Sequence, residues 1–176
     1  MHELKIIFAG FGGQGILSMG KFLAHAGMDE NLNVSWLPSY GPEMRGGTAN
    51  CSVILTKSDI GSPIIYSADA VVAMTRPALD KFEDQIVSGG LLIYDSDLIT
   101  RQPARSDITA IKIPAQTRAE SIGNKKIANM ILLGALIAKT KIISVDSLLD
   151  SLKEHGKEGF YEINKKAINE GIGYGV

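Results

Sequence analysis

The sequence contains little cysteine, few aromatic residues and no excess of either charge. Its 176 residues include one cysteine, Cys51. A single thiol cannot form an internal disulfide, a Cys-x-x-Cys redox pair or the usual cysteine-ligated iron–sulfur cluster. Such cysteine usage is typical of a reducing, cytoplasmic setting. The sequence has 18 lysines and arginines and 19 acidic residues, and aromatic residues make up 6% of the chain. Neither the charge nor the stacking surface therefore indicates a nucleic-acid partner.

No segment predicts a membrane span or a secretion signal. The apolar run at residues 127–138 is interrupted by Asn129 and Gly134, and it is shorter than the roughly 20 residues that cross a bilayer. The first apolar run, residues 4–9, ends at a glycine, unlike a signal peptide. Because the chain shows no repeat, low-complexity tract or linker, we expect residues 1–176 to form one domain.

Short apolar runs alternate with amphipathic segments along the chain. We predict strands at 4–9, 34–37 (stopped by Pro38), 51–55, 70–74, 91–94 and 108–113. We predict helices at 16–31, 76–87, 126–140, 145–154 (capped by Ser144) and 158–170 (stopped by Gly171). Small residues recur on one stripe of the first helix and would let it lie close on a sheet: Gly20, Ala24 and Gly27. The alternation predicts an α/β fold with three layers, a Rossmann-like, largely parallel sheet with helices on both faces.

A glycine-rich turn joins the first predicted strand to the first predicted helix. Gly10, Gly12 and Gly15 fit the pattern G-x-G-x-x-G, which offers backbone N–H groups at a helix N-terminus to an anion. A dinucleotide site also needs an acidic residue at the end of the second strand, but residues 34–39 contain neither an acid nor an arginine. This argues against NAD. The turn either lets the first helix pack tightly or presents its N–H groups to another anion or a neighbouring subunit.

The second unusual segment is the loop at residues 39–48. Its candidate binding residues are Tyr40, Glu43, Arg45, Gly46 and Gly47. Loops that follow the carboxyl ends of parallel strands share one edge of the sheet, so we expect this loop beside the glycine turn. The alternative is a solvated loop in which Glu43 and Arg45 pair with each other. We favour a functional loop, because ten-residue loops with this density of glycine, proline and charge are typical of binding sites.

The sequence offers no obvious nucleophile or metal site. His2, His25 and His155 are scattered along the chain, so no Ser-His or Cys-His pair is indicated. Cys51 lies inside a predicted strand, where a buried and inert thiol is expected. We therefore assign no catalytic residue and no metal ligand to this chain.

Two loop motifs carry a family resemblance. Residues 8–16 (FAGFGGQGI) followed by residues 38–47 (PSYGPEMRGG) resemble the gamma subunit of 2-oxoacid:ferredoxin oxidoreductases of the 2-oxoglutarate or 2-oxoisovalerate type. Residues 127–136 (IANMILLGAL) resemble the buried helix of that family, so the resemblance covers essentially the whole chain. It implies an α/β subunit of a larger enzyme that oxidatively decarboxylates a 2-oxoacid to its acyl-CoA and passes electrons to ferredoxin. Of the substrates in the family, we favour 2-oxoglutarate.

The resemblance also implies partners and cofactors. The partners are alpha and beta subunits, with a ferredoxin-like delta subunit as a further candidate, and ferredoxin accepts the electrons. Thiamine diphosphate, magnesium and iron–sulfur clusters are expected on partner subunits, so the isolated chain should be folded but inactive. This chain is expected to touch coenzyme A through the loop residues named above and through the turn residues Gly10, Gly12, Gly13, Gln14 and Gly15.

Two alternatives stay open. The chain could be an assembly module that binds no small molecule, or a stand-alone Rossmann-like nucleotide-binding enzyme. Partner-facing surfaces of obligate complexes are apolar, so we also expect an exposed apolar patch formed by Phe11, Trp36, Tyr40 and Met44. A homodimer of the isolated chain would hide part of that patch.

Overall fold

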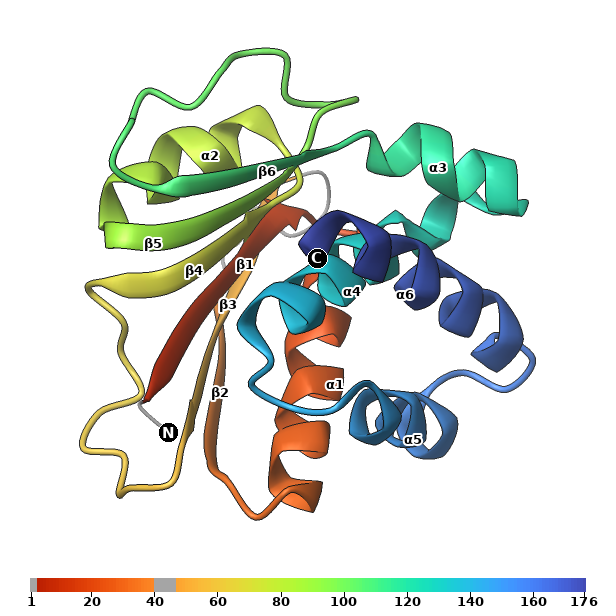
Figure 1. Ribbon diagram of the computed structural model, residues 1–176, viewed down its shortest axis with the longest axis horizontal. Helices are drawn as coiled ribbons and strands as arrows, with labels where there is room; N and C mark the ends of the chain where they lie inside the picture. The colour runs from red at the N-terminus through yellow and green to blue at the C-terminus, as the bar shows by residue number, and fades with distance from the viewer. Residues whose placement is uncertain (1–2, 40–46) are drawn as a thin grey trace.

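The computed structural model describes residues 3–39 and 47–176. A six-stranded sheet forms its middle layer, and helices cover both faces (Figure 1). Helix α2 packs on one face, whereas α1 and α3–α6 pack on the other. The three-layer α/β architecture predicted from the sequence is confirmed.

One strand of the sheet is reversed with respect to the others. The strands are β1 (Leu4–Phe11), β2 (Asn33–Ser39), β3 (Thr48–Thr56), β4 (Ala68–Ala73), β5 (Ile86–Asp95) and β6 (Thr109–Ile113). They lie in the order β2-β3-β1-β4-β5-β6. Strands β1, β4, β5 and β6 pair in parallel, while β3 is antiparallel to both β1 and β2. Because β3 separates β2 from β1, the β1–α1–β2 segment does not form the adjacent pair of strands that a dinucleotide-binding unit uses.

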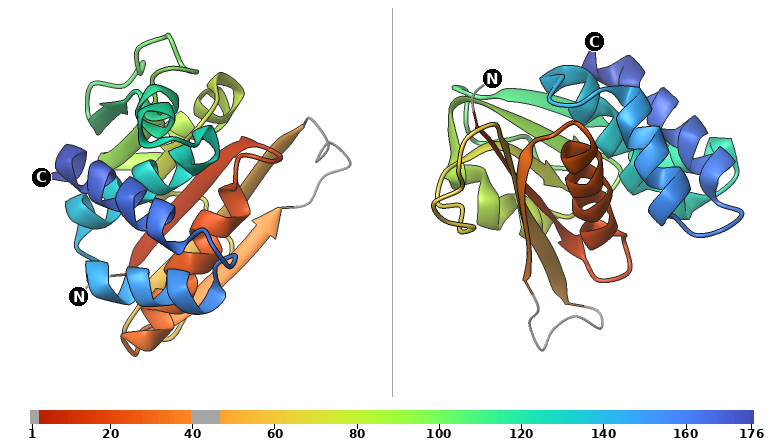
Figure 2. Two further views of the ribbon diagram at one scale, coloured as in Figure 1. Left: turned by 90° about the vertical axis from the view of Figure 1, so that its right-hand side faces the viewer. Right: turned by 90° about the horizontal axis from the view of Figure 1, so that it is seen from below.

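The helical layer on the α1 side is two helices deep. The helices are α1 (Ile16–Asp29), α2 (Arg76–Phe82), α3 (Ala115–Ile122), α4 (Ala128–Thr140), α5 (Val145–His155) and α6 (Tyr161–Gly175), with 3-10 turns η1 (Glu83–Gln85) and η2 (Lys125–Ile127). Helices α1 and α4 lie nearer the sheet, and α5 and α6 lie outside them (Figure 2). Helix α4 is therefore enclosed between the sheet and α6, which explains why it is apolar nearly all round.

Helix α1 approaches the sheet closely through its small residues, as predicted. A Cβ atom on Gly20 would lie 2.6 Å from the Cys51 sulfur, and one on Gly27 would lie 2.5 Å from a methyl group of Leu55. Any larger side chain at these two positions would push the helix away from β3, because interiors are close-packed.

Helix α5 is held against α1 by the residues that begin it. The Ser144 hydroxyl accepts a hydrogen bond from the Ser147 N–H at 3.0 Å, which confirms the predicted N-cap. The Glu30 carboxylate, at the end of α1, accepts the Ser144 N–H at 2.6 Å and the Ser147 hydroxyl at 2.7 Å. Burial favours the neutral acid, but these hydrogen bonds hold the pKa of Glu30 below its ordinary value.

Three predicted boundaries were wrong for reasons of tertiary structure. Strand β2 does not stop at Pro38 but continues to Ser39, because β2 is an edge strand, where the missing N–H of proline is tolerated. Residues 86–87 belong to β5 rather than to the preceding helix, since Ile86 is buried and pairs with Ala68. Gly89 and Gly90 therefore lie within β5, which begins before the strand predicted at 91–94.

Helix α3 was not predicted, since its sequence is mostly polar. Its first turn is held by carboxylates at the end of β5 and just after it: Asp95 accepts the Ala115 N–H and a hydrogen bond from the Gln116 side-chain amide, and Asp97 accepts the Thr117 N–H. Burial raises the pKa of Asp95 above its ordinary value, against the lowering effect of these hydrogen bonds. The anchoring residues lie about 20 positions away in sequence, so no local pattern shows them.

The final helix passes through Gly171, where we predicted its end. A Cβ atom at Gly171 would overlap the Ile131 carbonyl oxygen of α4, and one at Gly134 of α4 would overlap the Ile168 carbonyl oxygen of α6. Both glycines let the two helix backbones touch. Glycine here serves helix packing rather than helix termination.

We predict that Gly171→Ala lowers the free energy of unfolding by about 2–3 kcal/mol, because the added methyl group forces α4 and α6 apart. Gly173→Ala is the matched control on the same helix. No described atom lies within 4 Å of a Cβ at that position, and alanine favours helix over glycine by about 1 kcal/mol. Urea denaturation measures both variants. Equal effects of the two changes would contradict the account of α4–α6 packing.

Candidate functional site

The candidate site lies at the carboxyl ends of β1 and β4. The helix that follows β1 is α1, which packs on one face of the sheet. The helix that follows β4 is α2, which packs on the opposite face. Ligands of open α/β sheets bind in the crevice that such a divergence creates. A cavity of about 220 Å³ occurs there, between the glycine turn, Met74 and Gln116.

The glycine turn and the end of the second loop are joined directly. The Gly12 N–H donates to the Gly47 carbonyl oxygen at 3.0 Å. The prediction that the two segments share one edge of the sheet is confirmed by this hydrogen bond. The candidate residues Tyr40, Glu43, Arg45 and Gly46 lie outside the described residues.

Within the turn, Gln14 braces the backbone. Its side-chain oxygen accepts the Phe11 N–H at 2.7 Å, and a Cβ atom at Gly10 would lie 2.6 Å from that oxygen. The Gln14 side chain is thus used inside the turn, and Gly10 leaves the space for it. Of the predicted turn residues, Gln14 and Gly10 have structural roles in this arrangement.

Gly15 is fixed by a buried residue from the far end of the chain. Its φ of 74° places it in the left-handed region, which favours glycine. The Asn129 side-chain amide of α4 donates to the Gly15 carbonyl oxygen at 3.1 Å, and a Cβ atom at Gly15 would overlap that amide. Asn129 is 5% exposed. The first turn of α1 is therefore tied to the first turn of α4.

This arrangement leaves backbone donors pointing outward. The N–H groups of Gly13, Gly15 and the first three residues of α1 have no hydrogen-bond partner among the described residues, and the Met19 N–H is the first of the helix to donate, to the Gly15 carbonyl oxygen. A helix N-terminus with free N–H groups favours a negatively charged ligand. Gly13 is the most open of these positions, because no described atom lies within 4 Å of a Cβ built there.

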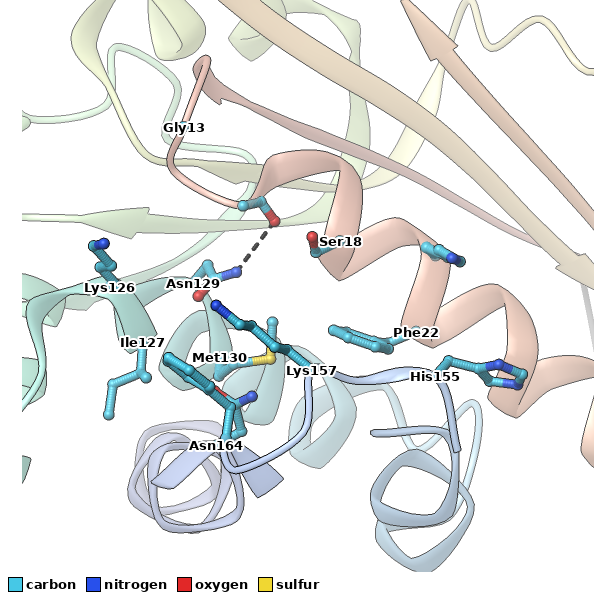
Figure 3. Close-up of a pocket in the computed structure, with 13 residues that line it drawn as sticks. Gly13, Ser18, Phe22, Lys126, Ile127, Asn129, Met130, His155, Lys157 and Asn164 are labelled. Carbon is cyan, nitrogen blue, oxygen red and sulfur yellow. Dashed lines mark hydrogen bonds between the residues drawn. The ribbon is translucent and has the colours of Figure 1, made fainter. Parts of the chain in front are cut away.

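A second cavity, of about 310 Å³, opens beside the turn. It lies between α1, the start of α4 and the connection from α5 to α6 (Figure 3). Its three lysines, Lys21, Lys126 and Lys157, come from three separate elements, and His155 also lines it. No aspartate or glutamate is found among the described residues that line it. Asn129 and Gly13 line both cavities, so the two form one continuous surface around the turn.

His155 stacks on His25 of α1 at the rim of this cavity. The ring centroids are 3.7 Å apart and the planes differ by 21°. Burial, followed by the neighbouring His155 and Lys21, lowers the pKa of His25 below its ordinary value, and Asp29 and Glu154 oppose this only in part. Burial and the stack therefore favour the neutral form of His25, and the stack joins α1 to the end of α5.

Cys51 is buried, as predicted, and is not a candidate nucleophile. Its side chain is fully inaccessible, and burial raises the pKa of the thiol to about 12. A thiol of this kind stays protonated at neutral pH and is unreactive.

The predicted apolar patch is only partly described. Phe11 is 39% exposed and Trp36 is partly buried against the core, whereas Tyr40 and Met44 lie outside the described residues. The patch as a whole therefore stays a prediction.

Sequence reasoning missed the cationic cavity and Asn129. The three lysines come from α1, η2 and the α5–α6 connection, and only the fold brings them together. Asn129 did carry a signal, since it is a polar residue in an otherwise apolar segment. Across residues 3–39 and 47–176, no group of three or more His, Cys, Asp or Glu side chains is arranged to hold a metal ion. None of the described helices is long and apolar enough to cross a membrane.

The fold and these cavities define an α/β domain in which lysine side chains and backbone N–H groups lie around a glycine turn. Comparison with known proteins gives the family. The profile described as pyruvate ferredoxin/flavodoxin oxidoreductase matches residues 5–174, and the chain belongs to this family.

Two relatives differ in how much of their own length is matched. The chain is 37% identical over 172 residues to ketoisovalerate oxidoreductase subunit VorA of Methanothermobacter thermautotrophicus, covering 96% of this chain but 36% of that protein. It is 34% identical over 170 residues to 2-oxoglutarate synthase subunit KorC of Methanocaldococcus jannaschii, covering 95% of this chain and 91% of that protein. The chain thus spans about a third of the VorA subunit and nearly the whole KorC subunit.

Two solved structures share the fold. The gamma subunit of a keto/oxoacid ferredoxin oxidoreductase from Geobacter sulfurreducens is 30% identical, with a TM-score of 0.86 and coverage of 98% of both chains. The 2-oxoglutarate:ferredoxin oxidoreductase from Magnetococcus marinus, solved with 2-oxoglutarate, coenzyme A and succinyl-CoA bound, is 26% identical with a TM-score of 0.89. That match covers 99% of this chain and 31% of the Magnetococcus chain.

We predict that Gly15→Ala and Asn129→Ala are not additive. Gly15→Ala costs about 1–2 kcal/mol because of its left-handed backbone, and about 1 kcal/mol more because the methyl group displaces the Asn129 amide from its hydrogen bond. In the Asn129→Ala background that second cost disappears. A double-mutant cycle of unfolding free energies measures the coupling. Strict additivity would show that Asn129 does not hold the turn.

The His25–His155 stack predicts a pH dependence of stability. The folded-state pKa of His25 lies below its ordinary value of 6.5, so the unfolded chain binds more protons as the solution becomes acidic. The free energy of unfolding therefore falls as the pH drops through 6.5 toward the folded-state pKa. His25→Phe keeps a flat ring without a titrating group and should reduce this fall, as measured by denaturation at pH 8 and pH 5.5. An unchanged pH dependence would refute the role of the stack.

Proposed function

We propose that this chain is the gamma component of a multi-subunit 2-oxoacid:ferredoxin oxidoreductase. Its nearly full-length match to KorC and to the Geobacter gamma subunit supports this role. The KorC match favours 2-oxoglutarate as the 2-oxoacid. The match to VorA, at 37% identity, makes the branched 2-oxoacid ketoisovalerate the second candidate.

The residues of the chain support a division of labour between subunits. One buried cysteine does not suit an iron–sulfur cluster, and the sequence has no thiamine diphosphate motif. In the proposed assembly, thiamine diphosphate with magnesium and iron–sulfur clusters on alpha, beta and ferredoxin-like delta subunits supply decarboxylation and electron transfer to ferredoxin. The single buried thiol is in keeping with a reducing, cytoplasmic setting.

We further propose that the glycine turn and the loop at residues 39–48 contact coenzyme A. The observation that carries this proposal is the Gly12–Gly47 hydrogen bond, which brings the N–H groups at the start of α1 beside that loop. Backbone N–H groups suit a phosphate, and an arginine such as Arg45 binds one through two parallel hydrogen bonds. The coenzyme A bound to the Magnetococcus enzyme gives the ligand class.

The other two interpretations differ in what they require. A stand-alone dinucleotide enzyme would need β2 beside β1 and an acid at the end of β2, but β3 lies between them and β2 ends at Pro38-Ser39. An assembly module needs no ligand at all, and only a ligand-dependent measurement separates it from the coenzyme A proposal.

The test uses the complex reconstituted from this chain and its partner subunits. With 2-oxoglutarate, coenzyme A and a dye acceptor, the complex should turn over and the isolated chain should not. Arg45→Ala should raise the KM for coenzyme A about tenfold for each 1.4 kcal/mol of lost contact, with assembly intact. Arg76→Ala, an exposed arginine on α2 at the opposite face of the sheet, is the control and should leave that KM unchanged.

Turnover by the isolated chain would contradict the gamma assignment. An Arg45→Ala complex that fails to assemble, or that assembles with an unchanged coenzyme A dependence, would replace the coenzyme A contact by an assembly role.

A further inference from the structure

Strand β2 forms an open edge of the sheet. It pairs on one side with β3, over all of Asn33–Ser39 and with no register shift. Among the described residues, no strand pairs with its other side, and none of the residues of β2 is buried (Figure 2). An edge of this kind presents unpaired N–H and C=O groups to a further strand.

The β2 edge lacks the charges that usually protect an exposed edge. Asn33–Ser39 contains no charged residue, whereas the strand at the other edge of the sheet, β6, carries Lys112. Lysine and proline on an edge strand both hinder pairing with another chain, and β2 has only Pro38 of these two. A strand that pairs with β2 therefore meets no charge that it must repel or bury.

Pro38 shows which backbone groups of β2 point outward. Proline has no N–H, so in an edge strand its nitrogen lies on the side away from the neighbouring strand. Alternate residues of a strand direct their backbone groups to the same side, and the pairing with β3 is unbroken. The backbone groups of Val34 and Trp36 therefore point outward as well. Neither backbone N–H donates to a loop or turn among the described residues.

Helix α1 fixes the shape of this edge. A Cβ atom on Gly20 would lie 2.9 Å from the ring nitrogen of Trp36, and one on Gly27 would lie 3.2 Å from a methyl group of Val34. The helix thus packs directly on the two residues whose backbone groups point outward. A segment that is already ordered loses little conformational entropy when it binds.

The edge is complementary to itself in one antiparallel register. With a two-fold axis at Ser35, Val34 of each chain lies opposite Trp36 of the other, and each such pair exchanges two hydrogen bonds. Pro38 then lies opposite Leu32, beyond the paired segment, so its missing N–H costs nothing. A register centred on Trp36 would instead set Pro38 opposite Val34 and lose a bond on each side. Two-fold interfaces need this self-complementarity.

We propose that two copies of the free chain pair through β2, so that one sheet continues across a two-fold axis at Ser35. The occupant of the edge is a second copy of this chain, because the uncharged strand and the position of Pro38 suit pairing with itself. The inference goes beyond the proposed function and does not rest on it, since it concerns the chain outside the assembled enzyme.

The first test is a cross-link at the two-fold axis. Residue 35 faces its own copy in a non-hydrogen-bonded pair, where Cα atoms lie about 4.5 Å apart, which is within the range of a disulfide. Oxidised full-length Ser35→Cys should therefore run as a covalent dimer on a non-reducing gel. Ser39→Cys is the matched control on the same strand and the same face, and it should stay largely monomeric. The natural thiol, Cys51, is buried and should not react.

The second test is sedimentation equilibrium of the full-length chain. The unchanged chain should show a concentration-dependent dimer. Ser35→Lys brings two ammonium groups together at the axis and should raise the dimer Kd by about tenfold or more. Ser39→Lys adds the same charge beyond the paired segment and should leave the Kd unchanged. Circular dichroism checks that both variants keep the fold.

Two results would overturn the proposal. One is a chain that stays monomeric up to about 1 mM together with equal cross-linking of the two cysteine variants. The other is cross-linking of Ser35→Cys only to a different subunit in the reconstituted complex, which would assign the edge to that subunit. Failure of the gamma role would be seen separately, as a reconstituted complex without turnover, and would leave the dimer measurements unaffected.

Discussion

The hydrogen bond from the Asn129 side-chain amide to the Gly15 carbonyl oxygen fixes the geometry of the candidate site. It joins the N-terminus of α1 to that of α4, two elements that start 112 residues apart, at Ile16 and Ala128. Because this bond and the Gln14 brace satisfy groups inside the turn, the outward N–H groups at Gly13 and at the start of α1 stay available to a ligand. Helix α4 is enclosed between the sheet and α6, and this packing holds Asn129 in place. The packing of α4 therefore helps to keep the glycine turn in its observed conformation.

The reversed strand β3 sets what kind of ligand surface the sheet can offer. By separating β1 from β2, it removes the dinucleotide-binding arrangement and instead places the end of the second loop on the glycine turn through Gly12 and Gly47. The cationic cavity then opens on the other side of Asn129. Lysine side chains and free backbone N–H groups therefore lie close to the same turn.

Local pattern predicted the strands, most helices and the glycine turn, because apolar period and glycine spacing are properties of short segments. It failed where distant residues decide: Gly171 lies within α6 because α4 touches it, and α3 forms because Asp95 and Asp97 hold its first turn. The same limit applies to the site. Gly10 to Gly15 could be read from the sequence, whereas Lys21, Lys126 and Lys157 form a cluster only after folding.

The most direct test of the proposed function, in which the glycine turn braced by Asn129 contacts coenzyme A, is a nitrogen-15 NMR titration of the full-length chain with coenzyme A. The account predicts that the largest shifts occur at the backbone amides of Gly13, Gly15 and the first turn of α1, together with the Asn129 side-chain amide. Saturating shifts confined to other surfaces, or none at millimolar coenzyme A, would contradict it.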